Sequence, residues 1–314
     1  MKKFHYADSE KMVYSEGNTV YIDTKGDKTD IRIKNVLLDL FALFKRALRK
    51  GIHNVMLCHE NIIVVVNRKI LFYKANELKY EMNIARGKRP LRQGMECLNG
   101  KLFYGDYWVN PERVPSHLYC VDLSSYKQEV FISFEYIQHI HFVQKDLLLP
   151  NSLLIGTGDK DSECGLYQLD INSKKLITIV EGSQKVRAVS ILQHGVHLIW
   201  GSDAPDEDNY IYHFNRETNK MKQLHKIEGP AYYSTMDANA YMYIATTVEY
   251  RDKHQAVIYR SRDNGLNWSE FKRFKKDIWG THYFGYGIVE FIKGQEHRDK
   301  LFYNAVGLNE IRKS

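Results

Sequence analysis

Hydrophobic and polar positions alternate along most of the chain in short runs that turn residues separate, which predicts β-strands throughout. Five segments share one layout, in which two strands precede a third strand, a polar turn and a fourth strand, and the second strand ends in small or acidic residues. These segments begin near Asn54, Gly94, Ile140, Arg187 and Ala231. A repeat of roughly 40–50 residues with four strands per unit predicts the blades of a β-propeller.

The two ends of the chain are expected to form one further blade together. The last segment, 287–308, reads as two strands, and the N-terminal segment 19–34 reads as a third and a fourth strand with their turn. Joining them would remove the exposed sheet edges. The sequence therefore predicts an all-β, six-bladed β-propeller of four-stranded blades, closed by N-terminal strands that complete the last blade, as a single domain over 1–314.

One segment breaks the strand pattern. Residues 36–50, "VLLDLFALFKRALRK", place most apolar side chains on one side of a helical wheel and the cationic ones on the other. The segment predicts an inserted amphipathic helix. It either packs on the rim of the propeller or docks on anionic lipid or a membrane-bound partner.

Composition and charge exclude some classes of protein. The net charge is +7 with both signs interspersed, and no basic stripe with interleaved aromatic residues appears, which disfavours nucleic-acid binding. The four cysteines lie far apart in the sequence, which predicts reduced residues of the core. No apolar leader and no long apolar run is visible, so we expect a cytoplasmic protein, with peripheral contact at the inner membrane face through 36–50 as an alternative.

Polar residues gather at two positions of each repeat, before the first strand and after the second, which open on one face of a propeller. The residues expected to bind substrate there are His53, Arg89, Arg92, Tyr107, Gln184, Arg187, Asn209 and Tyr286. Those expected to do chemistry are His139, His141, Tyr233, Asp159, Asp203 and Asp106. Such a set suits an anionic sugar, because Arg clamps carboxylates and Tyr stacks on sugar rings. The structural alternative is that these residues form turns and surface.

The pair His139 and His141 raises the question of a metal. Alternation on a strand points both side chains the same way, and a third ligand would have to come from Asp159 or His53. We expect no cofactor, with a divalent metal at this pair as the alternative.

The stretch "SRDNGLNW", residues 261–268, resembles the Asp-box of the sialidase superfamily. Ser261, Asp263, Gly265 and Trp268 match that motif, while Asn267 stands where Thr is usual. The resemblance implies a turn between the third and fourth strands of a blade, in which Gly tolerates positive φ and Trp packs on the blade edge. In that superfamily the box is structural and lies away from the catalytic face.

Further stretches resemble a poorly characterised group of sialidase-like, BNR-type propellers associated with glycans. They are "KRALRKGIHNV", "YGDYW", "HIHF", "GTGD", "GSQKVRAV", "WGSDAP", "NYIY" and "FGYG". The chain departs from true sialidases, because the Arg-Ile-Pro motif is missing and no Tyr/Glu nucleophile pair can be assigned.

Two classes of function follow. The first is an enzyme that cleaves an acidic polysaccharide. A lyase would use Arg89, Arg92 or Arg187 against the uronate carboxylate and His139, His141 or Tyr233 for proton transfer, whereas a hydrolase would use two of Asp106, Asp159 and Asp203. The second is a non-catalytic glycan- or protein-binding scaffold associated with membrane-bound polysaccharide synthesis. The sequence favours the enzyme and names neither the sugar nor the reaction.

Overall fold

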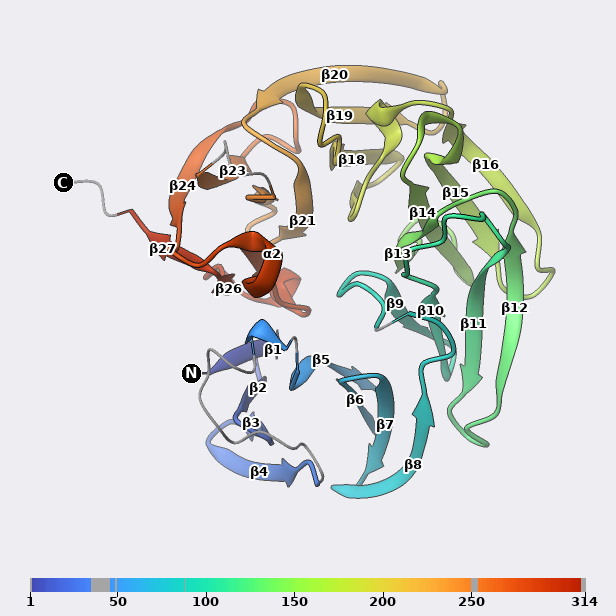
Figure 1. Cartoon of the computed structure of the whole chain (residues 1–314), viewed down its shortest axis with the longest axis vertical. Coiled ribbons are helices and arrows are strands. Elements are labelled where there is room, and N and C mark those ends of the chain that lie inside the picture. Colours follow the sequence, from blue (N-terminus) through green and yellow to red (C-terminus); the bar gives the residue numbers. More distant parts are fainter. Residues whose placement is uncertain (1, 35–45, 49, 88, 250–253, 312–314) are drawn as a thin grey trace. The chain divides into compact units, whose positions relative to one another are not determined.

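The chain folds as an all-β, six-bladed β-propeller of four-stranded antiparallel blades, as the sequence predicts (Figure 1). This computed structural model describes residues 2–34, 46–48, 50–87, 89–249 and 254–311. The chain divides into two compact units. The first comprises 1–83, 235–264 and 268–314, and the second comprises 84–234 and 265–267. A single domain over 1–314 stays a prediction.

The second unit contains three blades that follow one another in chain order, from cyan through green to yellow in Figure 1. The first consists of β9 (Met95–Leu98), β10 (Lys101–Gly105), β11 (Ser116–Asp122) and β12 (Gln128–Phe134). The next consists of β13 (His139–Lys145), β14 (Ser152–Gly158), β15 (Gly165–Asp170) and β16 (Leu176–Glu181). The third consists of β17 (Leu192–His194), β18 (His197–Gly201), β19 (Asn209–Asn215) and β20 (Lys220–Ile227).

Burial follows the position of each strand within its blade. All seven residues of β14, "SLLIGTG", are buried, whereas most of β16, "LITIVE", is exposed. Blades pack face to face through their inner strands, so these strands are apolar on both sides. The core between the first two blades of this unit includes Phe103, Ile140 and Ile155.

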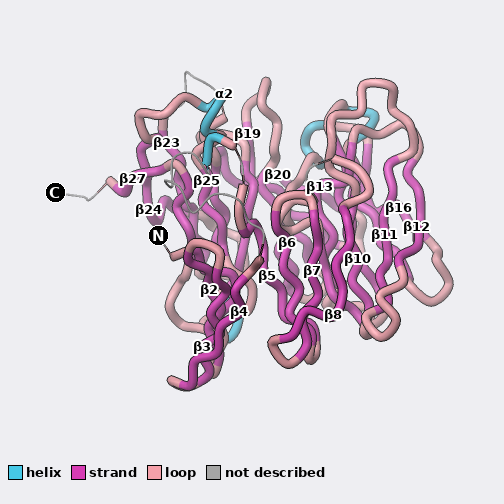
Figure 2. Tube along the Cα trace, turned by 60° about the horizontal axis from the view of Figure 1, so that its bottom comes forward, coloured by secondary structure: helices cyan, strands magenta, loops and turns pink. Residues whose placement is uncertain are grey.

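The first unit contains two complete blades from the N-terminal part of the chain. One consists of β1 (Lys3–Ala7), β2 (Lys11–Glu16), β3 (Thr19–Thr24) and β4 (Asp27–Arg32). The other consists of β5 (Ile52–Cys58), β6 (Asn61–Val66), β7 (Lys69–Lys74) and β8 (Glu77–Asn83). Figure 2 shows how completely strands, in magenta, dominate over helical segments, in cyan.

The C-terminal part adds a five-stranded sheet and a hairpin. The sheet contains β21 (Ala231–Met236), β22 (Met242–Thr246), β23 (Gln255–Ser261), β24 (Ser269–Lys276) and β27 (Leu308–Glu310). The hairpin pairs β25 (Ile288–Phe291) with β26 (Tyr303–Val306).

The predicted completion of the last blade by N-terminal strands is wrong. Strands β3 and β4 pair with β1 and β2 in a sheet of their own, and β25–β26 is a separate two-stranded sheet. The cause is an N-terminal hairpin that the pattern did not reveal, in which Asp8 accepts the N–H groups of Glu10 and Lys11 and so turns β1 into β2. The chain ends still meet, because the Ala7 N–H donates to the Lys293 carbonyl at 3.0 Å.

Most of the predicted helix over 36–50 lies outside the described residues. Arg46 and Ala47, at its end, have helical backbone, and Arg46 forms an ion pair with Asp277. Among the described residues, the other helical pieces are α2 (Thr281–Phe284) and three 3-10 turns, η1 (Asp161–Glu163), η2 (Gln184–Val186) and η3 (Gln295–His297). None of the helices described is long and apolar enough to span a membrane.

The turn between β23 and β24 has the features expected of the box-like motif. The Ser261 hydroxyl donates to Asp263 at 2.8 Å, Gly265 has a φ of 85°, and Trp268 is buried. Asn264 also has positive φ, at 58°. The motif therefore stabilises a turn.

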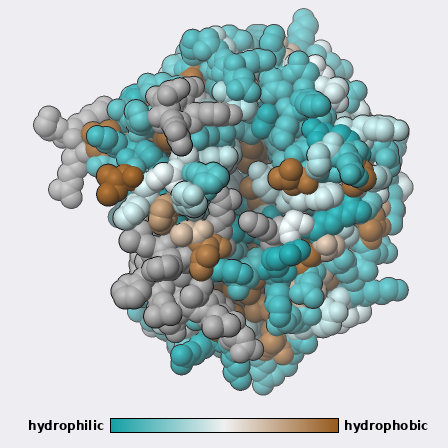
Figure 3. Space-filling view, viewed as in Figure 1, coloured by the Kyte–Doolittle hydropathy of each residue, from teal (hydrophilic) through white to brown (hydrophobic). Residues whose placement is uncertain are grey.

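The surface and the cysteines show nothing unusual. On the face in Figure 3, the coloured apolar side chains appear in small separate groups among hydrophilic ones. Scattered exposed apolar residues are ordinary on folded chains. All four cysteines are free thiols, as the sequence predicts, and three of them, Cys58, Cys120 and Cys164, are buried.

Candidate functional site

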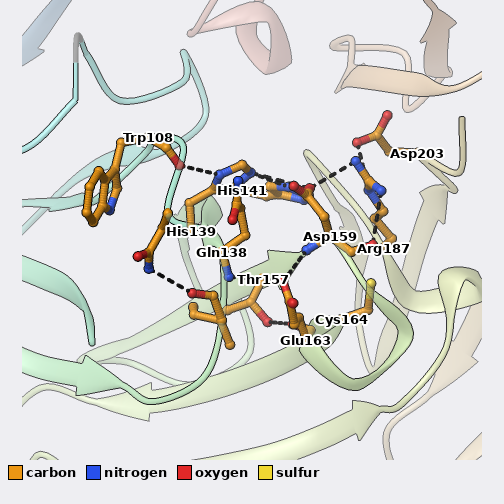
Figure 4. A network of polar contacts seen from close by, with 12 residues as sticks. Trp108, Gln138, His139, His141, Thr157, Asp159, Glu163, Cys164, Arg187 and Asp203 are labelled. Atoms are coloured by element: carbon orange, nitrogen blue, oxygen red, sulfur yellow. Dashed lines mark hydrogen bonds and ion pairs between the residues drawn. The ribbon is translucent and has the colours of Figure 1, made fainter. Parts of the chain in front are cut away.

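The two predicted histidines converge at the start of β13, in the second unit (Figure 4). Their Nε2 atoms lie 3.0 Å apart. His139 pairs with Gly158 of β14, but the register shifts between Ile140 and Phe142, which makes His141 the extra residue of a β-bulge. A bulge re-aims a side chain, and here it supports a closer approach than simple alternation predicts.

A glycine makes room for this arrangement. A Cβ atom on Gly158 would lie 2.4 Å from Cε1 of His141. No side chain fits at that distance, so the imidazole of His141 lies against bare backbone of β14.

Backbone carbonyls hold the other nitrogen of each imidazole. Nδ1 of His139 lies 3.1 Å from the carbonyl oxygen of Trp108, and Nδ1 of His141 lies 3.2 Å from that of Ala188. Both imidazoles are buried. Each ring is therefore fixed in orientation with its Nε2 turned toward the other.

Asp159 completes the group from the turn after β14. Its Oδ1 lies 3.5 Å from Nε2 of His139 and 3.4 Å from Nε2 of His141. The same oxygen lies 3.0 Å from NH2 of Arg187, whose Nε lies 3.3 Å from Asp203. Among the described residues, His139, His141 and Asp159 form the one group of three His, Cys, Asp or Glu donor atoms close enough to hold a metal ion together.

The protonation states in this cluster follow from burial and neighbouring charge. Burial lowers the pKa of His139 to about 4, and charge repulsion with the neighbouring His141 acts in the same direction. Burial would raise the pKa of Asp159, but the 3.4 Å contact with His141 and nearby positive charge outweigh it and lower that pKa. The positive charge is that of Arg187 and, at the low pH where Asp159 takes up a proton, that of both histidines. At neutral pH His139 is therefore a neutral imidazole and Asp159 a carboxylate.

Glu163 holds the two sides of the cluster together. Its carboxylate accepts the N–H of Asp159 at 3.0 Å, the N–H of Gln138 at 3.0 Å and Nε of Arg113 at 2.7 Å. Neither Glu163 nor Arg113 is among the site residues that the sequence predicts. The stretch Asp161–Glu163 follows β14 closely and forms a short 3-10 turn, which returns the buried Glu163 toward the end of that strand.

Aromatic and cationic side chains border the histidines. The ring centroid of Tyr107 lies 4.3 Å from that of His139, and Tyr107 is half-buried. The guanidinium of Arg86 lies 5.6 Å from the ring centroid of Trp108 and keeps a third of its side-chain surface exposed. Asp106, next to Tyr107, is buried and accepts the N–H of His117 at 2.9 Å, and burial raises its pKa.

The structure brings together several of the predicted site residues and separates others. Around Asp159 it collects His139, His141, Gln184, Arg187 and Asp203, with Asp106 and Tyr107 nearby. Asn209 instead holds a turn, exchanging hydrogen bonds with the backbone of Ala204. Arg92 and Tyr233 are buried and Arg89 is half-exposed, while His53 and Tyr286 belong to the first unit.

Comparisons with known proteins identify the fold and no family. No family model and no curated protein matches the chain. The extracellular domain of a chain assigned to the hybrid two-component systems of B. thetaiotaomicron superposes with a TM-score of 0.61 at 15% identity, over 99% of this chain and 38% of that one. This chain therefore spans well under half the length of that relative.

Two carbohydrate-active enzymes are also similar in fold. The GH74 xyloglucanase from Xanthomonas campestris gives a TM-score of 0.58 at 11% identity, over 86% of this chain and 44% of that one. Oligogalacturonate lyase in complex with manganese gives 0.53 at 11% identity, over 85% and 77%. The chain is thus a member of the six-bladed propeller class, and these likenesses do not single out the sialidase superfamily.

Proposed function

We propose that this chain is a carbohydrate-active propeller that binds an acidic polysaccharide beside His139, His141 and Asp159 and cleaves it. The observation that carries the proposal is the convergence of these residues with Tyr107 and Arg187 at one end of β13. Structural needs alone do not explain so many facing polar groups, and functional sites gather such groups with shifted pKa values. Asp159 keeps 30% of its side-chain surface exposed, so a ligand can reach it.

Two of the fold neighbours support the substrate class. One is a xyloglucanase and the other an oligogalacturonate lyase, and both names describe enzymes that act on carbohydrates. The support is by analogy of fold, because function depends on the residues at a site. The kinship with the sialidase superfamily likewise stays a prediction.

The burial of the carboxylates favours elimination over hydrolysis. A hydrolase needs two carboxylates beside the glycosidic bond. Asp106 and Asp203 are only 2% and 3% exposed, which leaves Asp159 as the accessible member of the predicted three.

β-Elimination requires positive charge at the uronate carboxylate and a group that transfers protons at C5 and at the leaving oxygen. Arg187 is only 15% exposed and is engaged by both Asp159 and Asp203. We therefore assign the carboxylate contact to Arg86, which pairs with Asp106 at 3.6 Å but keeps 32% of its side-chain surface exposed. We assign proton transfer to the hydroxyl of Tyr107, because the predicted Tyr233 is buried. The Tyr107 phenolate would take the C5 proton, the C4=C5 double bond would form as the C4–O bond breaks, and the same phenol would return the proton to the departing oxygen.

The test is incubation of the purified chain with a panel of acidic polysaccharides, following ultraviolet absorbance of the C4=C5 bond and reducing ends together. A rise in both is expected, and Tyr107→Phe should abolish it while Tyr136→Phe, a change at an exposed residue of the same unit, should not. Reducing ends without absorbance would mean hydrolysis, with Asp159 as one of the two carboxylates.

Silence in both signals would overturn the enzyme. If the glycan were still retained on an affinity gel, the chain would be a binding scaffold. The ion pairs of Arg187 with Asp159 and Asp203 favour this alternative, because they occupy the guanidinium. Association of 36–50 with a membrane belongs to that alternative and stays a prediction.

A further inference from the structure

The two imidazoles have too few protons for the contacts they make. Trp108 and Ala188 offer carbonyl oxygens, which only accept, so each Nδ1 must carry a hydrogen to satisfy its contact. A neutral imidazole has one N–H, and both are then used. The Nε2 atoms consequently face each other at 3.0 Å as two lone pairs.

Asp159 adds a third acceptor to the same point. Its Oδ1 lies within 3.5 Å of both Nε2 atoms. Three acceptors thus surround one position. A neutral ring could place its one hydrogen on Nε2 only by giving up the hydrogen bond that its Nδ1 donates to a backbone carbonyl.

The spacing of the three atoms matches the ligands of one metal ion. Their separations are 3.0, 3.4 and 3.5 Å. Ligands that lie about 2.0–2.1 Å from a tetrahedral ion are about 3.3–3.4 Å apart, and adjacent octahedral ligands are about 3.0 Å apart. The triangle therefore fits around a cation without rearrangement of the backbone.

The surroundings provide the outer contacts that metal ligands have. A histidine that binds a metal through one ring nitrogen typically donates the N–H of the other nitrogen to a carbonyl or carboxylate. Here the Nδ1 of each ring contacts a backbone carbonyl, that of Trp108 or of Ala188. Ligating carboxylates are hydrogen-bonded in turn, and Arg187 supplies that contact to Asp159 at 3.0 Å. The bulge at His141 and the bare backbone at Gly158 are the structural devices that aim the second ring inward.

We propose that His139 Nε2, His141 Nε2 and Asp159 Oδ1 bind one divalent transition-metal ion on one triangular face, leaving further coordination positions for water or a ligand. Two imidazoles and a carboxylate suit Zn²⁺, Mn²⁺ or Fe²⁺, whereas Mg²⁺ and Ca²⁺ prefer oxygen ligands. This inference stands on the donor geometry and not on the proposed function. In that function the bound ion would add positive charge for a uronate carboxylate.

Direct metal binding tests the inference without any polysaccharide. The chain is stripped with a chelator, dialysed, and titrated calorimetrically with Zn²⁺ and separately with Mn²⁺, whose electron paramagnetic resonance reports the bound ion. We expect about one ion per chain. His141→Ala and Asp159→Asn should each weaken Zn²⁺ binding by more than about 100-fold, because the loss of outer contacts alone costs roughly 10–100-fold.

The chain contains a matched control. His197 and His213 form another histidine pair in the second unit, with ring centroids 4.7 Å apart, and do not belong to the three-donor group. His213→Ala should leave Zn²⁺ affinity unchanged. Equal losses in His213→Ala and His141→Ala, or no saturable binding by the folded wild-type chain, would overturn the site.

If a variant failed to fold, Co²⁺ added to the wild-type chain would still decide the matter. Its visible absorption should shift away from that of the aqua ion as imidazole nitrogens replace water. An aqua-ion spectrum would exclude the site.

Discussion

Strand β13 has a polar cluster at each end, and the two differ in whether donors match acceptors. At the far end, the carboxylate of Asp146 accepts hydrogen bonds from NH1 and NH2 of Arg216 at 2.8 and 2.7 Å. NH2 of Arg216 also donates to Gln168 at 2.7 Å, and the Leu148 N–H donates to Asp146 at 2.9 Å. Every group there is satisfied by the chain itself. At the near end, His139, His141 and Asp159 turn acceptors toward one another.

This difference assigns a structural role to the cluster around Asp146 and a ligand-binding role to the cluster around Asp159. A buried ion pair with complete hydrogen bonds fixes the fold and leaves nothing for a ligand. A buried group whose acceptors face each other is incomplete without a cation. Since His139 and His141 precede Asp146 by seven and five residues, the two clusters are roughly 16–23 Å apart along the strand and should respond to substitution independently.

The largest effect is expected at the complete cluster. Arg216→Met leaves the carboxylate of Asp146, whose side chain is fully buried, without its ion pair. The free energy of unfolding should fall by about 3–5 kcal/mol, measured by urea denaturation. Lys226→Met, which breaks an exposed pair with Asp208, is the control and should cost less than about 1 kcal/mol. Equal costs would remove the distinction between the two kinds of pair.

The incomplete cluster should gain stability from metal. At a free Zn²⁺ concentration of about 100 times Kd, the wild-type chain should gain about 2.7 kcal/mol of unfolding free energy. Arg216→Met should show the same increment and Asp159→Asn none. If the increment disappeared in Arg216→Met while the chain stayed folded, the two ends would be coupled and the comparison would fail.

A smaller effect is expected from the residue that positions Asp159. In Glu163→Gln, the amide NH2 would face an N–H that the carboxylate now accepts. Zn²⁺ affinity should fall roughly 10-fold with the stoichiometry unchanged. Glu163→Asp, which keeps the charge, should recover part of the loss. An unaltered affinity in Glu163→Gln would show that Asp159 does not depend on this contact.

The smallest effect is expected at the pair His197 and His213, in the pH dependence of the free energy of unfolding. Burial and the neighbouring His197 lower the pKa of His213, so the unfolded chain binds a proton there more readily than the folded chain. Stability should therefore decline slightly as pH falls below the ordinary histidine value of 6.5. His213→Asn should flatten this decline in a denaturation series from pH 7 to pH 5. A steeper decline in the variant would contradict the assignment.

The repeat and the histidine pair were accessible from sequence because both are patterns along the chain. The four-strand period predicted the blades, and the alternation in "HIH" placed His139 and His141 on one face of a strand. The sequence left the third residue open between Asp159 and His53. The carbonyls of Trp108 and Ala188 were not accessible, because main-chain acceptors have no sequence signature. The engagement of Arg187 by Asp159 and Asp203 was missed for a related reason, since partner choice depends on blade packing. The N-terminal blade was missed because β1 is short and its turn depends on Asp8.

Gly158 provides a marker for tracing this site through genomes. Because a methyl group there would lie 2.4 Å from Cε1 of His141, a larger residue at this position would force the imidazole to move, and we expect the histidine and the glycine to vary together. A search for His-x-His followed by Gly-Asp at the spacing found in this chain would separate propellers that keep the centre from those that keep only the fold. Chains with alanine at the glycine position should also have replaced the second histidine.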